Sequence, residues 1–380
     1  MKFKFDQIAI NSTAKKKPEP EDAANYIGLE HLIPGTFEIS EWGFSVAPVG
    51  EKLLMKKGDV LFGRRRAYQR KVGVAPFDGI FSAHGMVLRP RAEVVDESYF
   101  PFFISSDQFM NEAVRISVGS LSPTINWGTL KNCEFDLPPM EEQKKLAELL
   151  WAANDLKEKY KKAITATDEM LKAKFREMFG DAGDDSSRGD AEVRRCKIGE
   201  VCKIMNGYAF QSKKYVSSGI RVIRIANVQK GYVEDLIPAF YPISEKDNLT
   251  QFLLEENDLL LSLTGNVGRV ALLQKEMLPA ALNQRVACLR VVDKNVLDRD
   301  FLFAVMNNEE FESDCVESAK GSAQKNMSTE WLKRYEIPLP PLSLQREFVA
   351  IAEKAESAKT ALKKSIADID QVMKGLINNG

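Results

Sequence analysis

The sequence predicts an α+β fold in which two pseudo-repeated mixed α/β modules are separated by a pair of long antiparallel coiled-coil helices. Three observations lead to this prediction. One set of landmarks occurs twice, each set ends in a long pattern with heptad spacing, and short strand-like segments bounded by glycine and proline precede both patterns. A chain of 380 residues gives each module enough length for a core of its own.

The repeat rests on residues that keep a constant separation of 202 positions without a gap. The matched pairs are Gly119 and Gly321, Leu130 and Leu332, Pro138 and Pro340, and Gln143 and Gln345. Further upstream, residues 57–61 match 256–260 and residues 82–85 match 281–284 with a separation of 199. The repeating unit is therefore a globular module followed by a long helix.

Each long helix is predicted from apolar residues spaced alternately by three and four. The first follows Pro139 and runs to Phe179, with Gly180 as its stop, and the second begins after Pro341. The predicted seams are Leu146, Leu149, Ala153, Leu156, Tyr160, Ala163, Thr167 and Met170, then Leu171, Phe175 and Met178, and in the second helix Leu344, Phe348, Ile351, Ala355, Ala358, Leu362, Ser365, Ile369, Val372 and Leu376. Each stripe needs a partner, and we expect the two helices to pair antiparallel with pseudo-twofold symmetry. The alternative is that each helix packs only on its own module.

Strands are expected at 58–62, 71–75 and 85–89 of the first module. The loop between the first two concentrates positive charge, which an anion such as a DNA phosphate would neutralise, and a guanidinium can also bond guanine O6 and N7. The alternative is a solvated turn. The candidate DNA contacts of this module are Arg64, Arg65, Arg66, Tyr68, Gln69, Arg70 and Lys71, with Ser120, Ser122 and Thr124 after the glycine landmark.

The matching loop of the second module, residues 263–269, is less basic, but Asn and Thr side chains also bond base edges. Its glycines alone indicate only a hairpin. A second polar stretch, residues 205–214, precedes two further arginines. The candidate DNA contacts of this module are Tyr208, Lys213, Lys214, Arg224, Thr264, Asn266, Arg269, Gln324 and Lys325. His31 and His84 are expected to be structural or hydrogen-bonding residues and not metal ligands.

Composition limits the possible chemistry. The 53 basic and 54 acidic residues nearly balance, yet ten Lys or Arg and only two Asp lie between Lys52 and Arg91, so the charge is local. Five scattered cysteines favour reduced thiols, and no catalytic residues or metal ligands are expected. The absence of a Walker A lysine, of an Asn-Pro-Pro-aromatic motif and of a nuclease motif favours a binding protein. With no apolar run long enough to span a bilayer and no signal peptide, we expect a cytoplasmic protein without a membrane partner.

These features together resemble one family, the specificity subunits of Type I restriction-modification enzymes. The resemblance is carried by residues 26–30, by residues 58–72, by the Leu-Pro-Pro boxes at 137 and 339 with the glutamines that follow, and by the repeated layout. It covers essentially the whole chain. In that family two target-recognition domains each recognise one half of a bipartite DNA site, and helical conserved regions space them and bind methyltransferase subunits.

The resemblance implies a domain order and a set of partners. The predicted domains are target-recognition domain 1 at 1–138, the first spacer helix or central conserved region at 139–180, an acidic linker at 181–190, target-recognition domain 2 at 191–340, and the second spacer helix or C-terminal conserved region at 341–380. Expected partners are double-stranded DNA with an asymmetric bipartite site, two methyltransferase subunits and two restriction/translocase subunits. The chain itself would need no cofactor, because S-adenosylmethionine, ATP and magnesium would belong to those subunits.

Two other classes remain open from the sequence. A non-catalytic RNA-binding or architectural coiled-coil protein would also carry basic loops on a helical spacer, but it would not co-purify with an adenine methyltransferase. A self-contained nuclease or methyltransferase would act on DNA without partner subunits.

Overall fold

The computed structural model describes residues 1–45, 48–180, 193–319 and 326–379, and the acidic linker expected at 181–190 lies outside these residues. The chain forms two compact units. Unit 1 comprises residues 1–164 and 360–380, and unit 2 comprises residues 165–359. None of the helices in the described ranges has the length and apolar character needed to cross a bilayer.

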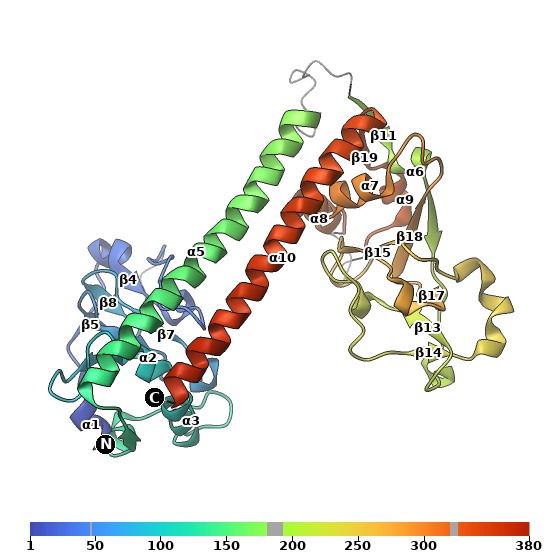
Figure 1. The fold of residues 1–380 in the computed structure, drawn as a ribbon. Helices are drawn as coiled ribbons and strands as arrows, with labels where there is room; N and C mark the ends of the chain where they lie inside the picture. The colour runs from blue at the N-terminus through green and yellow to red at the C-terminus, as the bar shows by residue number, and fades with distance from the viewer. Residues whose placement is uncertain (46–47, 181–192, 320–325, 380) are drawn as a thin grey trace. The chain divides into compact units, whose positions relative to one another are not determined.

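Unit 1 contains three small sheets covered by short helices (Figure 1). The strand orders are β1-β10, β2-β9-β6-β7 and β3-β5-β8-β4. The strands are β1 Lys2–Lys4, β2 Ala9–Ser12, β3 Lys15–Lys16, β4 Tyr26–Ile27, β5 Lys52–Met55, β6 Val60–Phe62, β7 Val72–Val74, β8 Gly79–Phe81, β9 Met86–Pro90 and β10 Glu134–Asp136. The helices are α1 Phe5–Ile8, η1 Pro20–Asn25, η2 Leu29–His31, η3 Ala67–Gln69, α2 Phe100–Ser105, α3 Asp107–Arg115 and α4 Trp127–Leu130. The three strands predicted from sequence are thus present as β6, β7 and β9.

Unit 2 repeats the two-stranded sheet and one four-stranded sheet of unit 1, whereas its third sheet has three strands. Its strand orders are β11-β19, β12-β18-β15-β16 and β14-β13-β17. The strands are β11 Arg194–Lys197, β12 Cys202–Asn206, β13 Ile220–Ile223, β14 Phe240–Tyr241, β15 Leu259–Ser262, β16 Val270–Leu272, β17 Ala280–Leu282, β18 Val286–Val291 and β19 Glu336–Leu339. The helices are α6 Ile198–Val201, η4 Ser212–Lys214, η5 Ile225–Asn227, η6 Ile243–Glu245, η7 Asp247–Phe252, η8 Lys275–Met277, α7 Arg299–Met306, α8 Glu309–Ser318 and α9 Thr329–Arg334. In both units one pair is parallel, β4 with β8 and β13 with β17, which confirms the repeat.

The turn before β6 in unit 1 is repeated in detail before β15 in unit 2. Gly58 and Asn257 both have positive φ, 88° and 67°, a conformation that glycine and asparagine tolerate best. The next residue in each turn is a buried aspartate. Asp59 accepts two bonds from Arg89, at 2.7 and 2.8 Å, and Asp258 accepts two from Arg290, both at 2.7 Å. A buried carboxylate held by a bidentate guanidinium therefore fixes the strand in each unit.

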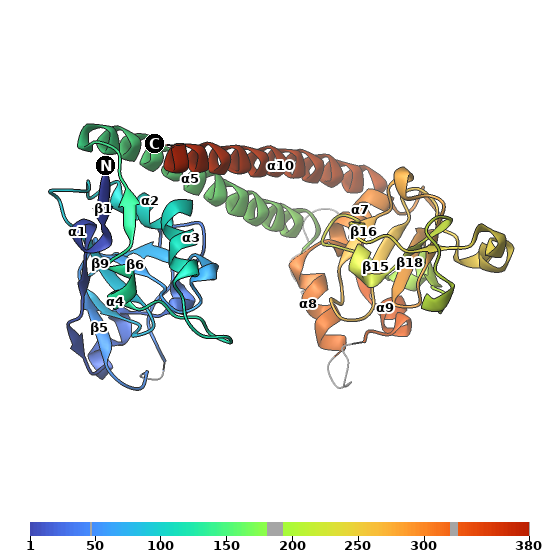
Figure 2. The same cartoon turned by 90° about the horizontal axis from the view of Figure 1, so that it is seen from below.

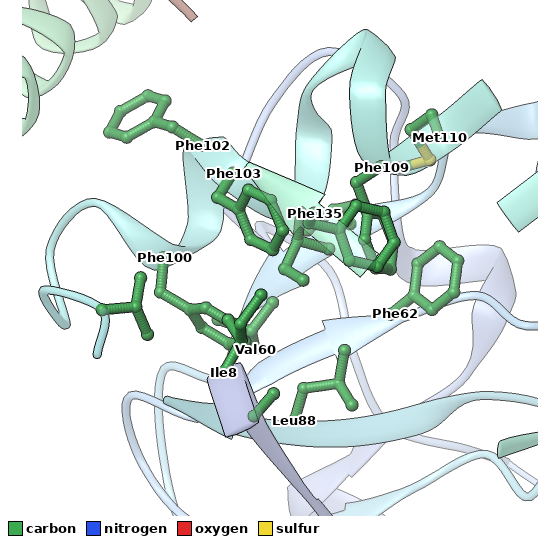
Figure 3. Packing of buried hydrophobic residues seen from close by; sticks show 14 of the residues in the cluster. Ile8, Val60, Phe62, Leu88, Phe100, Phe102, Phe103, Phe109, Met110 and Phe135 are labelled. Atoms are coloured by element: carbon green, nitrogen blue, oxygen red, sulfur yellow. The ribbon is translucent and has the colours of Figure 1, made fainter. Parts of the chain in front are cut away.

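The core of unit 1 is rich in phenylalanine (Figure 3). Phe62 of β6 and Phe135 of β10 both pack against Phe109 of α3, with ring centroids 5.3 and 5.5 Å apart. All three side chains are almost fully shielded from solvent. Burial of this size is the main stabilising term for a module with such short strands.

The two long helices are α5 Met140–Phe179 and α10 Leu342–Asn379, which confirms both predicted helices (Figure 2). The first part of α5 and the last part of α10 belong to unit 1, and the remaining parts belong to unit 2. Within each unit the two helices therefore run antiparallel. The fold class predicted from the sequence is the one observed.

The heptad period is confirmed, but several predicted seam residues are exposed, and at some of these places the next residue is buried instead. In α10, Ala358 and Val372 are exposed, whereas Lys359 and Met373, one residue later, are buried. In α5 the predicted seam residues Leu149, Leu156 and Met170 are 57%, 41% and 47% exposed, and the neighbouring Leu150 and Lys157 are buried. Two of the buried seam positions are lysines, Lys157 and Lys359, which a search for apolar residues passes over.

A buried glutamine joins each long helix to its module. The Gln143 amide oxygen accepts the peptide N–H of Asp96 at 2.9 Å, and its amide nitrogen donates to the carbonyls of Val94 and Pro138 at 3.1 and 2.9 Å. Gln345 makes the three corresponding bonds, at 2.8, 3.0 and 2.8 Å. The constant separation of the two glutamines thus reflects a repeated hydrogen-bond site.

Candidate nucleic-acid interface

In unit 1 the polar loop between β6 and β7 carries the arginines singled out above. The loop runs from Gly63 to Lys71 and contains η3. Arg66 and Arg70, on either side of η3, have φ of 57° and 52°, a left-handed conformation that costs about 1 to 2 kcal/mol for a residue with a Cβ. Ala67 is buried and anchors the loop on the core. The loop is held in a defined conformation.

This loop lies against the polar segment that follows Gly119. Arg65 and Thr124 form a β-bridge, and the side chains of Arg65 and Arg66 donate to Ser122 Oγ at 3.3 and 3.2 Å. The two segments are more than fifty residues apart in sequence, with 57 positions between Arg65 and Ser122. The structure therefore brings together the two candidate segments of the first module in one polar surface.

Several candidate side chains on this surface face solvent. Arg65, Arg66, Tyr68, Gln69 and Ser120 are exposed. Arg64 is half-buried and donates from Nη2 to the carbonyl of Ala83 at 3.1 Å. Its Nε is buried and has no hydrogen-bond partner among the described residues. Cationic donors are thus available on a rigid support.

Arg70 and Lys71 have partners inside unit 1. Arg70 forms an ion pair with Asp107 of α3, and the hydrogen bond from Arg70 holds the pKa of Asp107 below its usual value. The peptide N–H of Asp107 in turn donates to Asn378 of α10 at 2.9 Å. Lys71 Nζ donates to the carbonyl of Leu29 at 2.6 Å. These two side chains therefore tie the loop to the rest of the unit.

In unit 2 the loop between β15 and β16 lies against the segment that contains Asn326. Thr264 forms a β-bridge with Asn326, the counterpart of the bridge between Arg65 and Thr124. Asn266 is exposed, and the buried Oγ1 of Thr264 has no partner among the described residues. The other two candidates from that segment, Gln324 and Lys325, lie outside the described residues.

Most of the remaining candidates of unit 2 have partners within the unit. Arg269 Nη1 donates to Gln229 Oε1 at 2.6 Å, and Arg224 Nη2 donates to the carbonyl of Ile237. Lys214 pairs with Glu245 at 3.3 Å, while Lys213 is exposed. The ring of Tyr208 packs on Phe210 and Phe252, with centroids 5.1 and 5.3 Å away. These residues do not form one cluster, and several of them are engaged in contacts within the unit.

A third segment borders the loop in both units, and its repeat register differs from the predicted one. Gly85 N–H bonds the carbonyl of Ser82 at 3.0 Å, and Val286 N–H bonds that of Asn283 at 2.9 Å. The turn 82–85 therefore corresponds to 283–286, a separation of 201 rather than 199. The predicted match was wrong because the connection from β16 to β17 contains η8 and is longer than the connection from β7 to β8.

Comparison with known families finds a match over most of the chain. A family model described as the Type I restriction modification DNA specificity domain matches residues 40–166 and residues 191–371. The two matched ranges cover most of each module and most of each long helix. This family domain thus occurs twice in the chain.

Individual relatives agree with this match. The chain is 24% identical over 316 residues to the specificity subunit of the Type I restriction enzyme MjaVIII from Methanocaldococcus jannaschii, covering 79% of this chain and 73% of the relative. It is 22% identical over 403 residues to the putative MjaX specificity subunit of that organism, covering 98% and 89%. The crystal structure of a Type I restriction-modification S subunit from M. genitalium aligns with a TM-score of 0.60 at 13% identity, over 99% of this chain and 94% of that one. At that identity the structural likeness shows the fold alone.

Proposed function

Because the chain belongs to the Type I restriction-modification DNA specificity family, we propose that it binds double-stranded DNA and that each unit recognises one half of a bipartite site. The observation that carries this proposal is the repeated pairing of two polar segments. Arg65 with Thr124 in unit 1 and Thr264 with Asn326 in unit 2 mark the same place in the fold. Arginine, serine, threonine and asparagine are side chains that bond phosphates and base edges.

The two proposed faces differ in chemistry, so the site would be asymmetric. Unit 1 offers the exposed guanidinium groups of Arg65 and Arg66, which suit phosphate and guanine. Unit 2 offers Asn266, an amide that suits adenine, at the corresponding loop. Different donors in equivalent loops would select different bases in the two half-sites.

The long helices would serve as spacer and docking surface in the assembled enzyme. Equivalent surfaces on α5 and α10 support the binding of two copies of one methyltransferase subunit. Two restriction/translocase subunits would complete the complex. Those subunits would carry out adenine methylation with S-adenosylmethionine, and translocation and cleavage with ATP and magnesium. This chain would then need no catalysis of its own. The complex would act in the cytoplasm.

One experiment tests this proposal against its rivals. The chain is co-expressed with an adenine methyltransferase from the same genome, and methylated adenines are mapped across the host chromosome. We expect a single asymmetric bipartite sequence that disappears when this chain is omitted. Native mass spectrometry of the purified complex should show two methyltransferase copies for each copy of this chain. An RNA-binding or architectural protein would give no new methylation, and a self-contained methyltransferase would modify DNA without the added subunit.

A further inference from the structure

The turn that borders the polar loop is built in the same way in the two units. Ser82 Oγ accepts the peptide N–H of His84 at 3.3 Å, and Asn283 Oδ1 accepts that of Arg285 at 3.1 Å. The peptide N–H of Ser82 bonds Ile27 in β4, and the N–H of Asn283 bonds the corresponding strand β13. His84 and Arg285 therefore occupy equivalent positions, and both side chains are exposed.

Both positions adjoin the loop that carries the proposed DNA contacts. The carbonyl of His84 accepts the peptide N–H of Arg65 at 3.3 Å, and the carbonyl of Arg285 accepts that of Leu263 at 3.0 Å. In unit 1 the side chain of Arg64 also donates to Ala83, in the same turn. The turn and the loop are thus joined at the border of one polar surface.

The charged groups that act on His84 are all cations. Partial burial lowers the pKa of the His84 imidazole, and Arg65, Arg64 and Lys52 lower it further. Arg64 and Arg65 belong to the loop, Lys52 belongs to β5, and residues 118–125 include no ionisable side chain. The free protein therefore disfavours a further positive charge on His84, whereas an anion placed among these groups would favour it.

We propose that His84 and Arg285 are equivalent contacts to the DNA phosphate backbone, and that unit 1 takes up a proton at His84 when DNA binds. This inference rests on the proposed DNA-binding function. Arg285 carries a permanent charge at its position, so only the contact of unit 1 would depend on pH. The sequence analysis did not pair these two residues, because it used a separation of 199 positions for this turn and the structure shows 201.

The direction of the pH effect follows from linkage. If bound DNA raises the pKa of His84, the protonated protein binds more tightly, so affinity increases as the pH falls through the pKa of the bound state. The increase ends below the pKa of the free state. Each unit by which DNA raises the pKa corresponds to an affinity change of about tenfold.

The presence of only two histidines allows a direct measurement. In the full chain labelled with 13C at histidine Cε1, two resonances are expected, and His84→Asn assigns them. Titration with and without a short duplex carrying the mapped site should show a higher pKa for His84 in the complex and an unchanged pKa for His31. A scrambled duplex at low salt should have the same effect, because phosphates carry no sequence. A rise with the specific duplex only would indicate a base contact and would overturn the phosphate assignment.

Affinity measurements on the complex with its methyltransferase provide the second test. The wild-type complex should bind DNA more tightly at pH 6 than at pH 8. His84→Asn should lose this contribution of His84 to the pH dependence. His84→Arg, which copies unit 2, should bind at pH 8 as tightly as wild type binds at pH 6. Arg285→Ala should weaken binding equally at both pH values. If DNA binds but none of these variants changes its affinity or pH profile, the inference is wrong; if the wild-type complex binds no DNA, the proposed function fails instead.

Discussion

Lys157 Nζ of α5 lies 2.9 Å from Asp370 Oδ1 of α10, and the residues 202 positions from each of them form the reciprocal pair. In that second pair Lys359 Nζ lies 2.6 Å from Asp168 Oδ1. The first pair belongs to unit 1 and the second to unit 2. Both lysines are buried among the long helices. Each helix thus contributes a lysine to one pair and an aspartate to the other, as the internal repeat of 202 positions requires.

We expect Asp370→Asn to destabilise the protein more than Lys157→Met does. The asparagine removes the counter-charge of a buried ammonium group, whose other bond is to the carbonyl of Gly35, 2.7 Å away, whereas the methionine removes the buried charge itself. Asp370 is half-exposed, so the cost should be about 1 to 3 kcal/mol. Urea denaturation of both variants and the double variant measures the coupling. Asp168→Asn is the matched control and should cost less, because Lys359 also pairs with Glu356. Equal costs for the two asparagine variants would contradict this account.

Gln143→Leu and Gln345→Leu should destabilise the protein to a similar extent. Each change leaves one peptide N–H and two carbonyls without their partner in a buried site, and a loss of about 2 to 4 kcal/mol is expected. Thermal unfolding checks the loss. Lys145→Leu, an exposed position in the same turn of α5, is the control with the same new side chain. If the control lost as much stability as Gln143→Leu, the hydrogen bonds would not be the cause.

Arg65→Ala and Arg66→Ala should weaken DNA binding by the proposed complex. Loss of a phosphate contact weakens all sequences and lowers the salt slope by about one, and loss of a bidentate guanine contact costs about 1 to 3 kcal/mol at one base position. Binding curves at several salt concentrations distinguish the two. If neither variant changed the affinity or the slope, the loop would be only a solvated turn.

Arg70→Ala should behave differently, because Arg70 is paired with Asp107. The pKa of Asp107 is lowered in the folded protein. The ion pair therefore stabilises the folded state at pH values above the ordinary carboxyl pKa of about 3.9. This contribution is lost as the pH falls through the lower pKa of the folded state. Arg70→Ala should therefore reduce stability more at pH 7 than at pH 3. Denaturation at both pH values measures this, and a reduced salt slope of DNA binding would show that Arg70 also contacts phosphate.

Lengthening both long helices should change the preferred distance between half-sites. The two Lys–Asp pairs are separated by eleven residues on each helix, so four residues inserted after Tyr160 and four after Ile366 keep both pairs. The insertion adds about 6 Å along the helices, which corresponds to one or two base pairs of spacer. Methylation mapping should show unchanged half-sites and a longer spacer. Insertion in α5 alone is the control and should impair the complex, while retention of the original spacing by the double insertion would show that the helices do not set it.

Sequence alone was sufficient for the features that depend on periodicity. The separation of 202 positions held through Gln143 and Gln345 because both residues make the same bonds at the start of a long helix. The separation of 199 positions predicted for the turn around His84 was wrong, because surface connections differ in length there and no periodic pattern defines the register.

Polar partners account for the other differences. Lys157 occupies the seam because Asp370 and Gly35 satisfy its ammonium group, and a hydrophobic pattern cannot reveal such a position. Arg70 was grouped with the DNA-contacting arginines by its neighbours in sequence, but its partner Asp107 lies 37 residues away. Whether a charged side chain faces solvent or a protein partner depends on contacts that only the folded chain displays.

The division of the long helices between the units has a consequence for biosynthesis. Unit 2 is one continuous stretch of sequence, so it can complete its core as soon as residue 359 has left the ribosome. Unit 1 is translated first, yet it needs Met373 of α10 for its core and Asn378 for its bond to α3. Its core stays incomplete during synthesis of the whole second unit, and a ribosome that stalls before α10 releases a product with an exposed apolar surface, the kind of surface that chaperones and proteases recognise.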